Sequence, residues 1–223
     1  MSNMEYRDDE AFLAWRDAMY RLTSGQEAAR SWRRSRYTFA HRLGAALVGA
    51  TEAGAAISGP VIYGVWLRWG LLYVGQTREA ERRLRDLPVG ESHHLANTFP
   101  PEIWHRVVVV AWPMLVEAQP LAARFGSDAV GLALEHALQG QLRPLVNSER
   151  RTSDGGWRDV MWEDSRSRGA RIAHEVVELV QAVRKVWDDA ACQPAGGMAA
   201  PPSCRVVFPG ELLSQKAAES QRP

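Results

Sequence analysis

The fold is decided by the stretch PVIYGVWLRWGLLYVGQTREAERRL, residues 60–84. Its first part, residues 61–67, is rich in Val, Ile, Tyr and Trp, which favour a β-strand. The short connection that follows ends at Gly70, a residue type that adopts the positive φ of tight turns at little cost. Residues 71–76 predict a return strand, and from Arg78 onward the composition favours a helix with a charged face. The stretch therefore predicts a β-hairpin that leads directly into a basic helix.

The hairpin and the helix bring together three side chains with useful chemistry. Tyr63 and Tyr73 fall on the two paired strands, and Arg83 falls on the helix that follows. A guanidinium fork matches the oxygens of a phosphate, and a phenol can carry a proton. The alternative is structural, because strand tyrosines usually pack in the core. Arg83 also has arginine neighbours on its helix, and Arg82 could take its place if the register shifted by one residue.

This stretch, together with two later residues, resembles the GIY-YIG nuclease domain. Four motifs of that family are matched in order over residues 59–148: Val61-Ile62-Tyr63, Tyr73-Val74-Gly75, Arg83 ten residues after the second tyrosine, and Glu135 followed by Asn147. The resemblance implies an α+β fold, a small sandwich in which a three-stranded antiparallel sheet is flanked by helices. It also implies an endonuclease that hydrolyses phosphodiester bonds in double-stranded DNA.

The resemblance suggests a role for each matched residue. Tyr63 would take a proton from the attacking water, provided that nearby positive charge lowers its pKa from about 10. Arg83 would hold the scissile phosphate, and Glu135 would bind one divalent cation, Mg2+ or Mn2+, on the leaving-group side. Tyr73 would hydrogen-bond the water or the phosphate, and Asn147 would orient the site.

The chain departs from the family pattern at two positions. Many members carry a His or a Tyr one helical turn after the arginine, where this chain has Leu87. An aliphatic side chain cannot do acid–base chemistry, so His93 and His94, in the loop just beyond, are the candidates to supply an imidazole near neutral pH. Val61 stands where glycine is usual, and a β-branched residue is tolerated in an extended strand.

The remaining segments complete a chain of mixed helices and strands. Apolar periodicity predicts helices over residues 8–22, 26–47, 127–142 with Ser127 as N-cap, and 165–190, and it predicts a strand buried on both faces over residues 104–112. The Pro-, Gly- and Ala-rich end predicts disorder apart from an apolar patch at residues 206–208. We therefore expect a basic helical extension (1–58), the nuclease-like domain (59–150), a loop with a long helix (151–190) and a disordered tail (191–223).

Basic charge is concentrated rather than abundant. The formal net charge is only +1, but 25 of the 27 basic residues are arginine, whose planar fork suits phosphate. The helix over residues 26–47 carries five arginines and one acid, Glu27. We expect it to contact DNA phosphates, with a plain solvated helix face as the alternative. The residues expected to bind nucleic acid are Arg30, Arg33, Arg34, Arg36, Arg78 and Arg82.

Composition also bounds the class of protein. The sequence has no apolar run of about 18 residues, so no membrane-spanning helix is expected, and its first residues are acidic and polar, unlike a signal peptide. The two cysteines, Cys192 and Cys204, make neither a disulfide framework nor a zinc motif. This pattern predicts a reducing, cytoplasmic location.

Three functions remain open on the sequence alone. The first is a stand-alone, metal-dependent restriction or genome-defence endonuclease, which would meet duplex DNA as a homodimer if each protomer cut one strand. The second is a non-catalytic nucleic-acid-binding module on a degenerate nuclease fold, which Leu87 and the small net charge favour. The third, a helical structural protein with a chance hairpin, does not account for four motifs in order.

Overall fold

The computed structural model describes residues 25–51, 54–90, 95–147, 152–154, 156–158, 167–192 and 203–213, together with Leu13, Arg16, Asp17, Met19 and Tyr20. The chain divides into two compact units, Met1–Ala40 and His41–Pro223. The division falls inside helix α2 (Gln26–Val48), which matches the predicted helix to within one residue. The second unit includes the end of α2 and all of the predicted nuclease-like domain.

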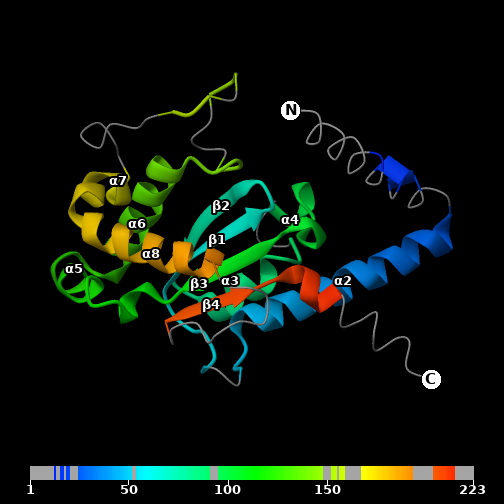
Figure 1. Cartoon of the computed structure of the whole chain (residues 1–223), viewed down its shortest axis with the longest axis horizontal. Helices are drawn as coiled ribbons and strands as arrows, with labels where there is room; N and C mark the ends of the chain where they lie inside the picture. Colours follow the sequence, from blue (N-terminus) through cyan, green and yellow to red (C-terminus); the bar gives the residue numbers. More distant parts are fainter. Residues whose placement is uncertain are drawn as a thin grey trace. The chain divides into compact units, whose positions relative to one another are not determined.

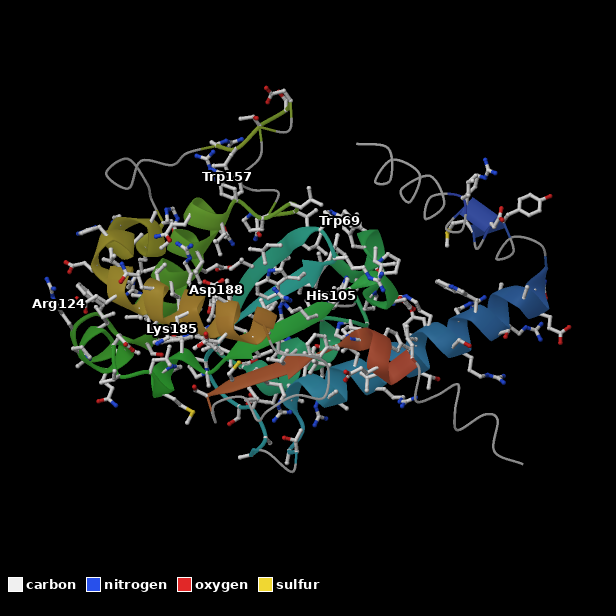
Figure 2. The ribbon with its side chains drawn as sticks, viewed as in Figure 1. Trp69, His105, Arg124, Trp157, Lys185 and Asp188 are labelled. Atoms are coloured by element: carbon white, nitrogen blue, oxygen red, sulfur yellow. The ribbon has the colours of Figure 1, made fainter. Side chains whose placement is uncertain are left out.

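Four antiparallel strands form the sheet of the second unit: β1 (Val61–Leu67), β2 (Gly70–Thr77), β3 (Arg106–Val110) and β4 (Cys204–Val207). The spatial order is β2-β1-β3-β4. The predicted hairpin is confirmed, and Trp69 lies exposed at its tip (Figure 2). Strand β3 lies between β1 and β4, and its four valines are fully buried, as a strand covered on both faces requires.

The prediction of three strands is wrong by one. The apolar patch near residue 206 is strand β4, which pairs with β3 over residues 204–207 in a segment that the composition had assigned to a disordered tail (Figure 1). Its pairing satisfies the free edge of β3, so the hydrophobic patch is stabilised by a strand almost one hundred residues earlier in the chain. Composition reflects only local preference and cannot reveal such a distant partner.

A single arginine on β4 ties this strand to the end of α2. The Arg205 side chain, 8% exposed, donates from Nη1 to the carbonyl oxygens of Ala46 at 3.1 Å and Gly49 at 2.6 Å, and from Nη2 to that of Ala55 at 3.1 Å. Carbonyls at a helix C-terminus have no partner within the helix, and a cation there also opposes the negative end of the dipole. The late strand thus closes the last turn of an early helix.

Replacement of Arg205 by Met should lower the free energy of unfolding by about 2 kcal/mol, because three carbonyl groups lose a charged donor. Urea unfolding followed by circular dichroism measures the loss. Arg85→Met, at an exposed position of helix α3 (Ala80–Asp86), is the matched control and should change stability little. Equal stabilities of the two variants would show that the Arg205 contacts contribute nothing.

The helices cover both faces of the sheet. On one face a core cluster joins Ile62 and Val108 of the strands to helices α6 (Ser127–Leu142) and α8 (Val177–Cys192). Tyr63 belongs to the other face, because side chains alternate along a strand. The remaining helical elements are α4 (Leu95–Thr98), η1 (Pro101–Ile103), η2 (Trp112–Met114), α5 (Ala118–Phe125), α7 (Arg168–Ile172) and η4 (Ala173–Val176).

Two further predictions need correction. The expected long helix over residues 165–190 is interrupted, since α7 passes through the 3-10 helix η4 before α8 begins. Helix α6 has the predicted bounds, but its N-cap is Gly126 rather than Ser127. Of the predicted helix over residues 8–22, the five described residues are helical and the others lie outside the described residues. Among the described residues, no helix is long and apolar enough to cross a membrane.

Candidate active site

The two motif tyrosines lie on the same face of the hairpin. Tyr63 is paired with Gly75 across the strands, and Val65 is paired with Tyr73, so the tyrosines are diagonal neighbours. Their ring centroids are 6.1 Å apart, with an angle of 37° between the planes. The short-range structure therefore brings the two phenols together, as the sequence predicts.

Gly75 makes this arrangement sterically possible. A methyl group on its Cα would lie 2.6 Å from the Tyr63 hydroxyl oxygen, 2.6 Å from Cε1 of Tyr73 and 2.7 Å from Cζ of Tyr63. Carbon atoms in contact are normally about 3.5–4 Å apart. Glycine is thus required at this position because both rings pack over its Cα, where a side chain would clash. Its φ is not positive, so backbone conformation does not require glycine here.

The surroundings of the Tyr63 hydroxyl determine the direction in which its pKa is shifted. The side chain is fully buried. Within the described residues its oxygen makes no hydrogen bond of good geometry, but the side chains of Arg83 and Tyr73 both lie within hydrogen-bonding range of it. Burial raises the pKa of this phenol, the Arg83 charge opposes the rise, and the Glu135 carboxylate adds to it. The expected lowering of the Tyr63 pKa is therefore wrong for the free protein, because loss of solvation outweighs one nearby cation.

The pKa of Tyr73 is shifted in the same direction as that of Tyr63. Burial raises its pKa, and the neighbouring Tyr63 and Glu135 raise it further, while Arg83 lowers it. Both phenols are consequently protonated at neutral pH in the free protein. Each can donate a hydrogen bond and accept one, but neither is a ready base without additional positive charge.

The geometry distinguishes Arg83 from its neighbour Arg82. Arg83 is half-buried on α3 and acts on both phenols. Arg82 is exposed, and its Nε donates to Glu79 Oε2 at 2.8 Å on the outer surface of the same helix. Adjacent residues on a helix point about 100° apart, so only one of the two can face the tyrosines. The choice left open by the sequence falls on Arg83.

Glu135 reaches the same group from α6. It is half-buried, and its carboxylate raises the pKa of both tyrosines, which places it within electrostatic range of them. Gln139, one turn further along α6, donates from Nε2 to Glu135 Oε1 at 3.3 Å and to the Val74 carbonyl at 3.2 Å. The amide therefore links the carboxylate to β2. Sequence reasoning missed Gln139, although its spacing of four residues from Glu135 is a usable signal.

Asn147 holds the outer edge of β2. Its side chain, 7% exposed, accepts from the Val74 N–H at 3.1 Å and donates to the Val74 carbonyl at 2.8 Å. The backbone N–H groups of Leu145 and Val146 donate to Leu71 and Leu72 in the same direction. The amide imitates one residue of a paired strand, and so it positions the residue next to Tyr73. This agrees with an orienting role.

The residues suggested to replace the missing imidazole are not placed. His93 and His94 lie outside the described residues. Leu87 itself is fully buried, and its N–H donates to the Arg83 carbonyl at 3.0 Å at the end of α3. Its side chain therefore belongs to the core and contributes packing rather than acid–base chemistry.

A divalent cation fits this arrangement through one carboxylate. The described residues contain no group of three or more His, Cys, Asp or Glu side chains arranged to hold a metal. Magnesium often binds through only one or two carboxylates, and it keeps several waters and uses substrate phosphate oxygens as further ligands. The half-buried Glu135, close to the buried Tyr63 phenol, suits that mode of binding.

The expected nucleic-acid-binding arginines are not equally accessible. Arg30, Arg33 and Arg34 of α2 are exposed, whereas Arg36 is only 9% exposed and is poorly placed to meet a phosphate. Arg78 and Arg82 are also exposed. Nη1 of Arg78 donates to Asp128 Oδ2 at 2.8 Å, so each of these two is paired with one carboxylate at the surface.

Comparisons with protein-family models, with curated proteins and with solved structures found no match to this chain.

Proposed function

We propose that the chain is a magnesium-dependent DNA endonuclease of the GIY-YIG type, on a GIY-YIG sandwich extended by the fourth strand. One observation carries the proposal. Two phenols, a guanidinium and a carboxylate from four separate elements lie within electrostatic range of one another, and the fully buried Tyr63 phenol has Arg83 and Tyr73 as its polar neighbours. Perturbed pKa values of this kind cluster at functional sites. Four ordered motifs add support, and a restriction or defence role would suit a stand-alone nuclease.

Each of these residues would have a separate role in phosphodiester hydrolysis. Arg83 would hold the scissile phosphate and oppose the charge that develops on its oxygens. Tyr63 would accept a hydrogen bond from the attacking water, and Tyr73 would fix the orientation of the Tyr63 ring. When a magnesium ion is bound, Glu135 would hold it, and the ion would supply Lewis-acid stabilisation of the leaving oxygen. Gln139 and Asn147 would keep the carboxylate and β2 in register.

Replacement of Glu135 by Gln should reduce the rate of plasmid cleavage in magnesium at least tenfold, because the carboxylate charge that would bind the cation is lost. Supercoiled plasmids of several sequences and modification states are incubated with protein and magnesium, and nicked and linear products are measured. Glu178→Gln, at an exposed position of α8, removes the same charge away from the site and should cut like the wild type. Cleavage that survives Glu135→Gln would exclude this residue as the metal ligand.

The second candidate is a DNA-binding module that does not cut. The burial of Leu87 in the core favours it, because no acid–base group stands at that position of α3. The same experiment separates the two functions. Wild-type protein that binds all of the plasmids and cuts none in magnesium or manganese would support the binding module.

A further inference from the structure

Two shallow hollows adjoin the candidate active site. One, of about 250 Å³, is lined by Arg82, Arg83 and the start of α3, and the other, also about 250 Å³, is lined by Leu132 and Arg168. They share Gln76 and Arg78 as lining residues, so they lie next to each other at the end of β2. The combined hollow, which we call the α3–α7 groove, runs from Arg83 past β2 to the first residue of α7.

The charge of the α3–α7 groove favours an anion. Its lining contains four arginines and two carboxylates, Glu79 and Asp128, which leaves a net charge of +2. Both carboxylates are engaged in exposed ion pairs with Arg82 and Arg78. Such surface pairs are weak, and a phosphate can replace a carboxylate as the partner of a guanidinium. The groove can therefore present four guanidinium groups to a chain of phosphates.

Arg168 is held at the far end of this groove by tight packing. Its neighbour Gly169 is buried so closely against α6 that a methyl group would lie 2.5 Å from the Leu132 carbonyl oxygen. The next residue, Ala170, is fully buried. The backbone of α7 is thus fixed on α6, while the side chain of Arg168 remains exposed. A fixed backbone places the guanidinium beside the groove at a low cost in conformational entropy.

We propose that the α3–α7 groove binds the backbone phosphates that flank the scissile phosphate of DNA, and that Arg168 is a phosphate-contacting residue. This rests on the proposed function, since it takes Arg83 as the end of the groove where cleavage occurs. Arg168 lies outside the segment that resembles the nuclease family, so the C-terminal helices form part of the substrate path. Asp128 limits the affinity by competing for Arg78.

Arg168→Ala should weaken binding to a short fluorescein-labelled DNA duplex about tenfold, and should lower the slope of log Kd against log salt by about 0.9, the value for one lost phosphate contact. Anisotropy titrations of the full chain in EDTA measure binding without cleavage. Arg171→Ala removes the same charge from an exposed position three residues further along α7, and it should leave the salt slope unchanged. Equal slopes and affinities for the two variants would overturn the proposal.

Asp128→Asn should tighten binding about threefold, because Arg78 loses a competing carboxylate and the groove gains one positive charge. A gain in affinity cannot come from misfolding, so this variant protects the test against a simple loss of structure. Unchanged or weaker binding by Asp128→Asn would count against the groove. If the wild-type protein cuts DNA and Arg168→Ala binds DNA as the wild type does, the proposal that the groove binds phosphates is refuted and the nuclease proposal stands. If both variants change DNA binding as predicted but the wild-type protein cuts no DNA, only the nuclease proposal is refuted.

Discussion

The Tyr63→Phe protein should fold at least as stably as the wild type and should cut DNA at least about 100-fold more slowly. Both effects come from the same hydroxyl group, which lowers stability because it is buried and which would assist the reaction in the proposed mechanism. Among the described residues the buried hydroxyl makes no hydrogen bond of good geometry, so its removal costs the fold little. If Tyr63 accepts a hydrogen bond from the attacking water, its removal takes away a group that acts only in the reaction. A residue retained only for packing could show the gain in stability but not the loss of cleavage.

The expected gain in the free energy of unfolding of Tyr63→Phe follows from the cost of burying the hydroxyl. Leaving a buried hydroxyl unsatisfied costs about 1–3 kcal/mol, and the nearby Arg83 offsets part of that cost, so Tyr63→Phe should gain up to about 1 kcal/mol at neutral pH. Tyr20→Phe removes a hydroxyl from a side chain that is 77% exposed, and it should change neither stability nor cleavage. Cleavage by Tyr63→Phe at the wild-type rate would exclude a chemical role for this phenol.

The pH dependence of stability provides a second measurement on the same variant. The folded state raises the pKa of Tyr63 and Tyr73 above the ordinary value of about 10. Stability from the neutral phenols is therefore fully present below about pH 10 and is lost as pH rises above it. Tyr63→Phe removes one of the two groups, so its advantage over the wild type in urea unfolding should grow above about pH 10. A constant difference would show that the phenol is not forced to stay neutral.

The local parts of this structure could be predicted from the sequence, because short-range rules determine them. The hairpin strand β1 and helix α6 have the predicted bounds, since strand composition and apolar periodicity act within a few residues. Strand β4 was missed because its stabilising partner is β3, far away in the chain. The same distinction applies to the site. Motif spacing placed Tyr63 beside Tyr73, whereas the electrostatic effect of Glu135 on both depends on how α6 packs against the sheet.

The error over the Tyr63 pKa has the same origin. The sequence contains the positive charge of Arg83 and its neighbours, and that charge does lower the pKa. It does not contain the degree of burial, which follows from the packing of α3 and α6 around the hairpin and which has the larger effect. Asn147 is similar, since its partner Val74 could be identified only once the segment at residues 145–147 was seen beside β2.

Gly75→Ala should destabilise the protein by about 3 kcal/mol and abolish cleavage, although alanine is otherwise acceptable in a strand. The added methyl group would lie within 2.7 Å of three atoms that belong to the rings of two buried tyrosines. Gly70→Ala is the matched control in the same strand, because no atom lies within 4 Å of its added methyl group. Its stability, measured by urea unfolding, should be within about 0.5 kcal/mol of the wild type.

A double variant identifies the cause of the Gly75→Ala loss. If the methyl group is excluded by the Tyr63 ring itself, Tyr63→Phe will not restore stability, since Cζ remains 2.7 Å away. Tyr63→Leu removes both Cζ and the hydroxyl, so in the Gly75→Ala background it should cost much less stability than it does alone. Additive effects of Tyr63→Leu and Gly75→Ala would mean that the two positions are not in steric contact. The second-motif glycine would then have no role in placing the Tyr63 phenol, and its resemblance to the GIY-YIG motif would lose its physical basis.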